Sequence, residues 1–193
     1  NIKNSPLVIF SHGFKGFKDW GPFNTISDMF VLSGINFLKF NFSHNGVSSE
    51  NLLEFTDLEA FGNNNFSIEL EDLENVIKWA KNNLEQKVDL SRIYLMGHSR
   101  GGGISILKAA SNSNVKKLVL WASVSDFEKR IENDKVNLWK ERGVAYVFNS
   151  RTNQQMPLYY QFYEDYIANK TKFSIPKACR MLSIPTLIIH ADN

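Results

Sequence analysis

Residues 92–103 read RIYLMGHSRGGG, an apolar run followed by a G-x-S-x-G motif over residues 97–101. We predict a buried strand at 92–96 and a helix over 104–110, just after the motif. Glycines suit so tight a strand-to-helix turn, because side chains there would clash with both elements. The turn would raise Ser99 above the sheet and aim the helix N-terminus at a reacting carbonyl. The stretch therefore predicts a nucleophile elbow with Ser99 as the catalytic nucleophile; a serine that only caps the helix is the alternative.

A second stretch, residues 11–14 (SHGF), follows another apolar run at residues 6–11. An enzyme that transfers acyl groups must stabilise a tetrahedral oxyanion, and preorganised backbone N–H groups do this well. One donor comes from the residue after the nucleophile, here Arg100, and the other from a loop after an earlier strand. We therefore expect the backbone N–H groups of Phe14 and Arg100 to form an oxyanion hole. A plain strand-to-loop turn is the alternative for residues 11–14.

Short apolar runs alternate with helical patterns along most of the chain. The predicted strands cover residues 6–11, 36–42, 92–96, 117–122 and 186–190. The predicted helices cover residues 23–32, 67–84 and 104–110. Strands that alternate with helices favour a mostly parallel sheet with helices on both faces, which is an α/β fold.

The stretch 125–183 interrupts this alternation because it is far longer than an ordinary connection between two strands. It is rich in aromatic residues: Phe127, Trp139, Tyr146, Phe148, Tyr159, Tyr160, Phe162, Tyr163, Tyr166 and Phe173. Residues 144–149 and 155–159 could form a small hairpin. We predict a lid inserted into the core, with most rings packing it onto the body and a few facing substrate. The expected organisation is a core over 1–124, a lid over 125–183 and a returning core strand over 184–193.

Four pieces of sequence resemble the α/β-hydrolases, and more narrowly the lidded feruloyl/cinnamoyl-esterase and dienelactone-hydrolase-like groups. They are LVIFSHGF (7–14), FNFSHNGVSS (40–49), GHSRGG (97–102) and IPTLIIHADN (184–193). The second piece departs from the F-D-F-R-G-H-G-x-S of those groups at Asn41, Ser43, His44 and Asn45. The resemblance implies the α/β-hydrolase fold and hydrolysis of an ester through an acyl-enzyme at Ser99. It implies no metal and no organic cofactor.

The rest of the catalytic triad is harder to place. In this fold the order along the chain is Ser, acid, His. The resemblance puts the acid at the residue after Asn193, with Asp192 as a second candidate and Asp126 as a third. The four histidines (His12, His44, His98 and His190) each belong to another motif. The general base is therefore expected beyond residue 193, and the chain is expected to be a fragment truncated at both ends.

The composition of the chain limits the kinds of binding partner to expect. A net charge of +2 gives no reason to expect nucleic acid or an anionic membrane. No apolar run approaches the ~18 residues that a membrane helix needs. We expect a small-molecule ester as substrate, a cytoplasmic location and a buried, unreactive Cys179. The alternatives left open are a non-catalytic binding protein of this fold, or a serine peptidase or thioesterase.

Overall fold

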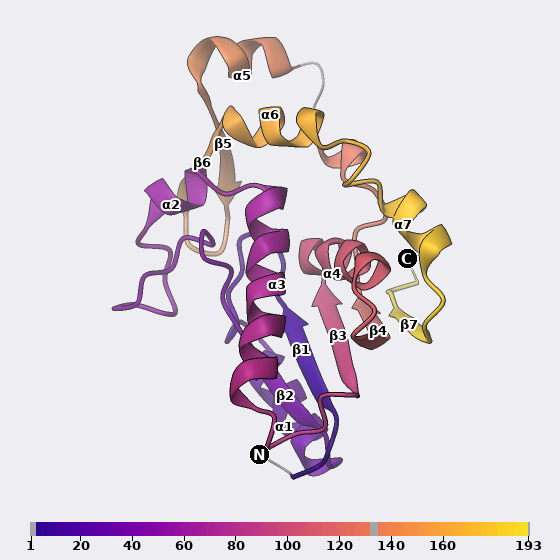
Figure 1. The fold of residues 1–193 in the computed structure, drawn as a ribbon. Coiled ribbons are helices and arrows are strands. Elements are labelled where there is room, and N and C mark those ends of the chain that lie inside the picture. The colour runs from indigo at the N-terminus through magenta and orange to yellow at the C-terminus, as the bar shows by residue number, and fades with distance from the viewer. Residues whose placement is uncertain (1–2, 132–134, 193) are drawn as a thin grey trace.

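The computed structural model describes residues 3–131 and 135–192, and its centre is a five-stranded sheet in the order β2-β1-β3-β4-β7 (Figure 1). All neighbouring strands are parallel. The strands are β1 (Leu7–Ser11), β2 (Asn36–Lys39), β3 (Ile93–His98), β4 (Val115–Trp121) and β7 (Thr186–Ile189). All five predicted strands are present, although β2 ends three residues earlier than predicted. The predicted α/β class is confirmed.

Helices cover both faces of this sheet. On one face, α1 (Phe23–Leu32) packs Phe23 against Val8, Phe10 and Met96 from the strands. On the other face lie α3 (Phe66–Asn83) and α4 (Arg100–Ser111), which are in front of the sheet in Figure 1. The α3 helix begins where the Asn65 side chain accepts a hydrogen bond from the Ile68 N–H. Because α4 starts at Arg100 rather than at 104, the turn that carries Ser99 is tighter than predicted.

The described part of residues 125–183 forms a layer of its own: most of it lies near the carboxyl ends of the strands, at the top of Figure 1, and its last helix lies lower, beside β7 and against α4. Its elements are η1 (Glu128–Arg130), α5 (Val136–Arg142), β5 (Val144–Asn149), β6 (Gln154–Tyr159), α6 (Gln161–Ala168) and α7 (Ile175–Met181). The antiparallel pair β5–β6 is the predicted hairpin, one residue longer. A short helix that the sequence did not predict, α2 (Leu58–Gly62), lies against β6.

Side chains fasten this layer to the body. Phe66 at the start of α3 stacks on Phe127 with ring centroids 4.1 Å apart, and Phe162 and Phe173 surround it. At the same end of α3, Asp165 of α6 accepts hydrogen bonds from the N–H and the hydroxyl of Ser67. The rings of Phe127, Phe162 and Phe173 thus pack against the start of α3, whereas Tyr146 and Phe148 are more than half exposed.

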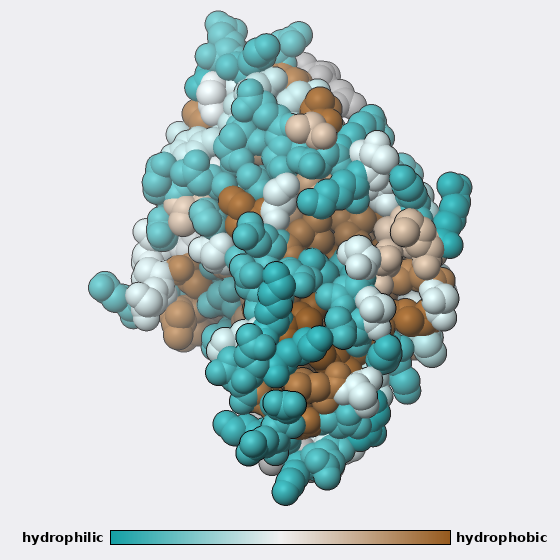
Figure 2. Space-filling view, viewed as in Figure 1, coloured by the Kyte–Doolittle hydropathy of each residue, from teal (hydrophilic) through white to brown (hydrophobic). Residues whose placement is uncertain are grey.

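The far edge of the sheet is much less covered. Every residue of β7 is exposed, including Leu187 at 56% and Ile188 at 67%. Figure 2 shows hydrophobic residues at the surface on the right-hand side, where Figure 1 places α7 and β7. Cys179 on α7 is exposed, so the expectation of a buried thiol is wrong. In residues 3–131 and 135–192, no helix is both long and apolar enough to cross a membrane.

Candidate active site

Ser99 occupies a strained turn between β3 and α4. Its φ of 54° and ψ of −120° lie in a region that residues other than glycine rarely adopt. Three backbone hydrogen bonds hold this conformation. The Ser99 N–H donates to the Trp121 carbonyl at 3.0 Å, and the Ser99 carbonyl accepts from Gly102 at 3.0 Å and Val124 at 3.2 Å. The strain is therefore imposed by the packed neighbours, which is typical of a functional position.

The glycines around Ser99 are required by close backbone contacts. A Cβ on Gly97 would lie 2.4 Å from the Gly101 carbonyl oxygen. A Cβ on Gly101 would lie 2.3 Å from the carbonyl oxygen of His12. Real Cβ atoms do not come this close to backbone atoms, so the turn can be built only with glycine at these positions. Close backbone contacts thus explain why the G-x-S-x-G motif has glycine at both of its ends.

The loop after β1 passes directly against Ser99. A Cβ on Gly13 would lie 3.0 Å from the Ser99 Cβ, so this loop and the elbow are in contact. Among the described residues, the backbone N–H groups of Phe14 and Arg100 have no hydrogen-bond acceptor. These two unpaired donors belong to the residue after Ser99 and to the residue after Gly13, the two positions that the sequence predicted for an oxyanion hole.

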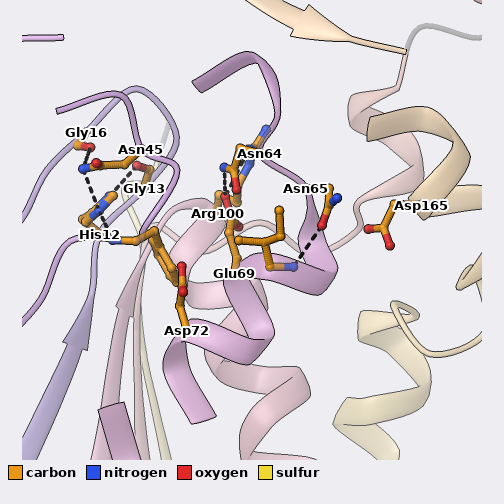
Figure 3. Close-up of polar contacts among 12 residues, drawn as sticks. His12, Gly13, Gly16, Asn45, Asn64, Asn65, Glu69, Asp72, Arg100 and Asp165 are labelled. Atoms are coloured by element: carbon orange, nitrogen blue, oxygen red, sulfur yellow. Dashed lines mark hydrogen bonds and ion pairs between the residues drawn. The ribbon is translucent and has the colours of Figure 1, made fainter. Parts of the chain in front are cut away.

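His12 fixes the shape of that loop (Figure 3). Its Nδ1 lies 2.9 Å from the Gly13 carbonyl oxygen, while its Nε2 lies 3.3 Å from the Phe42 N and 3.4 Å from the Asn45 Nδ2. These partners assign the ring proton to Nδ1, with Nε2 as the acceptor. Burial lowers the pKa of His12 from 6.5 to about 4, so the ring is neutral at pH 7. Asn45 also donates to the Gly16 carbonyl at 3.2 Å, which ties two loops together.

A cavity of about 650 Å³ opens above Ser99. The core contributes Phe14, Ser99 and Arg100 to its lining, and the 125–183 layer contributes Trp139, Tyr146 and Phe162 among others. The lining is mainly apolar, which suits a small organic ligand. In the described part of the chain, no group of three or more His, Cys, Asp or Glu side chains could hold a metal ion.

Comparisons with known proteins decide the family. A sequence model of the family described as "alpha/beta hydrolase fold" matches residues 62–193, which is more than half of the chain. The chain belongs to the α/β-hydrolase fold family. No curated protein sequence matches it.

Solved structures show the same fold at low identity. Est1E from Butyrivibrio proteoclasticus, in a structure with bound ferulic acid, is 18% identical with a TM-score of 0.73, over 97% of this chain and 69% of that one. A putative hydrolase from Agrobacterium vitis S4 is 15% identical with a TM-score of 0.68, over 98% of this chain and 80% of the other. A structure reported for the metagenome-derived lipolytic enzymes LipS and LipT is 15% identical with a TM-score of 0.67, over 98% and 73%.

Neither Asp192 nor Asp126, the two candidate acids of this α/β-hydrolase within the chain, lines the cavity that contains Ser99. Asp192 and His190 are exposed just after β7, and neither lines the cavity. Asp126 accepts a hydrogen bond from the Glu128 N–H at 2.8 Å, so its carboxylate supports the η1 turn. No histidine of the described residues hydrogen-bonds Ser99. Asn193, which borders the predicted position of the acid, lies outside the described residues.

Sequence reasoning missed a buried charge pair in this α/β-hydrolase. The Arg100 side chain, 14% exposed, lies 3.4 Å from Oε1 of Glu69, which is 4% exposed. Asn64 donates to the same Glu69 oxygen at 2.8 Å. Burial raises the pKa of Glu69, although Arg100 opposes this effect. The available signal was the position of Glu69, which falls on the apolar stripe of α3 with Leu70 and Leu73.

Proposed function

We propose that this protein is a serine hydrolase that cleaves a carboxylic ester through an acyl-enzyme at Ser99. The observation that carries the proposal is the forced positive φ of Ser99 beside two unpaired backbone N–H groups, at the base of an apolar cavity. Strain of this kind persists only where the surroundings over-determine it, and it gathers at reactive positions. A serine that merely caps a helix needs neither the strain nor the donors, and the Ser99 side chain makes no cap hydrogen bond.

The proposed reaction has two steps. The Ser99 Oγ forms a bond to the ester carbonyl carbon, the carbon–oxygen bond to the alcohol breaks, and the serine proton passes to the leaving oxygen. Water then attacks the acyl-enzyme, which releases the acid and returns the proton to Ser99. The N–H groups of Phe14 and Arg100 would stabilise the oxyanion in both steps. A general base is required as well, and we propose an acid–histidine pair that follows Ser99 in the chain order of this fold.

Residues 125–183 would act as the lid in this proposal. The layer contributes much of the cavity wall, so it would bury the apolar part of the ester and exclude water. Its attachment to α3 through Asp165 and Phe162 favours a lid that is largely preformed.

The test is covalent labelling of the full-length protein with a fluorophosphonate probe, read by mass spectrometry of the modified peptide. We expect one adduct on Ser99 and none in Ser99→Ala. Ser123→Ala is the matched control, because Ser123 sits beside the elbow and its hydroxyl only donates to the Val124 carbonyl. Labelling that survives Ser99→Ala would overturn the proposal.

One observation favours a second candidate. Since no described histidine hydrogen-bonds Ser99, a non-catalytic binding protein of the same fold fits these residues too. Absence of labelling, together with saturable binding of an ester, would support that candidate. Matched oxyester, thioester and anilide substrates would then separate an esterase from a thioesterase or a peptidase.

A further inference from the structure

The guanidinium of Arg100 is buried at the cavity with most of its donors unused. It has five N–H donors in a planar fork. Among the described residues, only Nη1 has a hydrogen-bond partner, the Glu69 Oε1 at 3.4 Å. Arg100 also lines the cavity, so the remaining donors are available to a ligand. A buried guanidinium with unused donors is costly unless something else pairs with it.

The group is also held rigidly. The guanidinium carbon lies 3.8 Å from the centroid of the Phe14 ring. The ring centroids of Phe66 and Phe162 lie 5.4 and 5.3 Å from the same carbon. Stacking of this kind fixes the plane of the guanidinium and lowers the entropy cost of forming further hydrogen bonds. Figure 3 shows Glu69, in the first turn of α3, between Arg100 and Asn64, which precedes the helix.

The charged side chains known to line the cavity are positive. None of the acidic side chains in residues 3–131 and 135–192 lines the cavity. Arg142, at the end of α5, lines it too and has no ion pair with those residues. Glu69 compensates Arg100 only in part, because the contact is long and its Oε2 has no partner among the described residues. The cavity therefore combines apolar walls with positive charge.

We propose that Arg100 binds a carboxylate carried by the acyl part of the substrate, so that the preferred esters are monoesters of short dicarboxylic acids. This inference rests on the proposed function. A carboxylate matches the two-pronged donor edge of a guanidinium, and the apolar walls fit the methylene chain between the two carboxyl groups. Ser99 and Arg100 line the same cavity, so an acyl group bonded to Ser99 would share that cavity with the guanidinium.

The test compares p-nitrophenyl hydrogen adipate with p-nitrophenyl hexanoate, which differ only by a carboxylate in place of the terminal methyl. We expect the full-length protein to favour the adipate at least about tenfold in kcat/KM, which corresponds to about 1.4 kcal/mol. In Arg100→Gln we expect the ratio to fall to about one. The ratio is taken within each variant, so a general loss of activity cancels. Arg180→Gln, a change on exposed α7 away from the cavity, is the matched control and should keep the wild-type ratio.

Hydrolysis of the hexanoate without preference for the adipate would overturn the inference and leave the proposed function standing. A preference that survives Arg100→Gln would overturn it as well. Hydrolysis of neither ester, with no probe labelling, would instead count against the proposed function. Calorimetric titration of the adipate ester into Ser99→Ala then tests Arg100 without catalysis. Binding at least about tenfold weaker in the Ser99→Ala, Arg100→Gln protein supports the carboxylate site, and equal binding refutes it.

Discussion

The strands β3 and β7 belong to one parallel sheet and end at the same edge, but their last residues lie in opposite surroundings. The end of β3 leads into a turn so tight that a single methyl group at Gly101 would enter the β1 loop. The end of β7 leads to His190 and Asp192, which are exposed, and the four residues of the strand itself are exposed too. The first end fixes the backbone of Ser99 through close contacts and hydrogen bonds, whereas the polar side chains at the second end are exposed.

This difference separates two kinds of candidate residue: one that is held by packing, and one that only matches a sequence pattern. Ser99 is placed by its backbone, because three hydrogen bonds and the close contacts at Gly97 and Gly101 hold the turn. Asp192 matches a sequence pattern, but nothing in the described residues holds its carboxylate toward the cavity. A residue whose geometry is imposed by packing is the stronger functional candidate. The predictions below test the imposed geometry at the elbow against the open end of β7.

The largest effect is expected from Gly101→Ala. The new Cβ would meet the carbonyl oxygens of His12 at 2.3 Å and Ser11 at 2.4 Å, and neither backbone can move without disturbing β1. We expect a loss of at least about 3 kcal/mol in the free energy of unfolding, or no folded protein. Urea denaturation followed by circular dichroism measures this.

Ile188→Thr on β7 is the matched change at the open end of the sheet. Its side chain is already 67% in water, so we expect a change below about 0.5 kcal/mol. If Gly101→Ala and Ile188→Thr lose similar free energies of unfolding, the elbow is no more constrained than the exposed edge. The contrast between the ends of β3 and β7 would then be wrong.

The tight end of the sheet was also the part that the sequence predicted best. Short apolar runs and glycine spacing are local signals, and they placed β1, β3 and the turn at Ser99 within a few residues. The β5–β6 hairpin was found for the same reason, since two β-prone runs flank a short polar turn.

Side-chain partnerships across the fold could not be predicted in this way. Nothing local to Arg100 shows that its guanidinium turns back over Phe14 toward Glu69, because this contact depends on how α3 docks beside α4. Glu69 lies in the first turn of α3, where the helix dipole favours an acidic residue even at the surface, yet it is buried. Long-range packing decides such pairs, and a single sequence does not contain that information in readable form.

A smaller loss of stability is expected from protonation of His12 on acidification. The His12 ring supports the loop next to the elbow. Its pKa is about 4 in the folded protein against 6.5 when unfolded, so the unfolded state takes up the proton first as the pH falls. The stabilisation is complete above the unfolded value and is lost on acidification toward the folded value. We expect about 2 kcal/mol of stability to be lost between pH 7 and pH 5 from this group.

The measurement is the free energy of unfolding in urea at pH 7 and pH 5 for the wild type and for His12→Gln. The glutamine variant should lose less stability over this interval by about 2 kcal/mol. His190→Gln, at the exposed end of β7, is the matched control and should follow the wild type. If the wild type and His12→Gln lose the same free energy of unfolding between pH 7 and pH 5, the buried ring is not the source of the pH dependence.

The smallest effect, and the most direct test of imposed strain, is expected from Ser99→Gly. Glycine adopts a φ of 54° without the clash that a Cβ brings, which relieves strain of about 1–3 kcal/mol. The greater freedom of glycine in the unfolded chain offsets about 0.5–1 kcal/mol of this gain. We therefore expect Ser99→Gly to be about 1 kcal/mol more stable than Ser99→Ala, which lacks the hydroxyl but keeps the Cβ. Both variants lack the hydroxyl, so both should lose labelling by the probe. If only Ser99→Gly gains stability, the strain comes from the backbone conformation. If instead the glycine variant unfolds at lower urea than the alanine variant, the turn is not strained, and the main support for Ser99 as nucleophile falls with it.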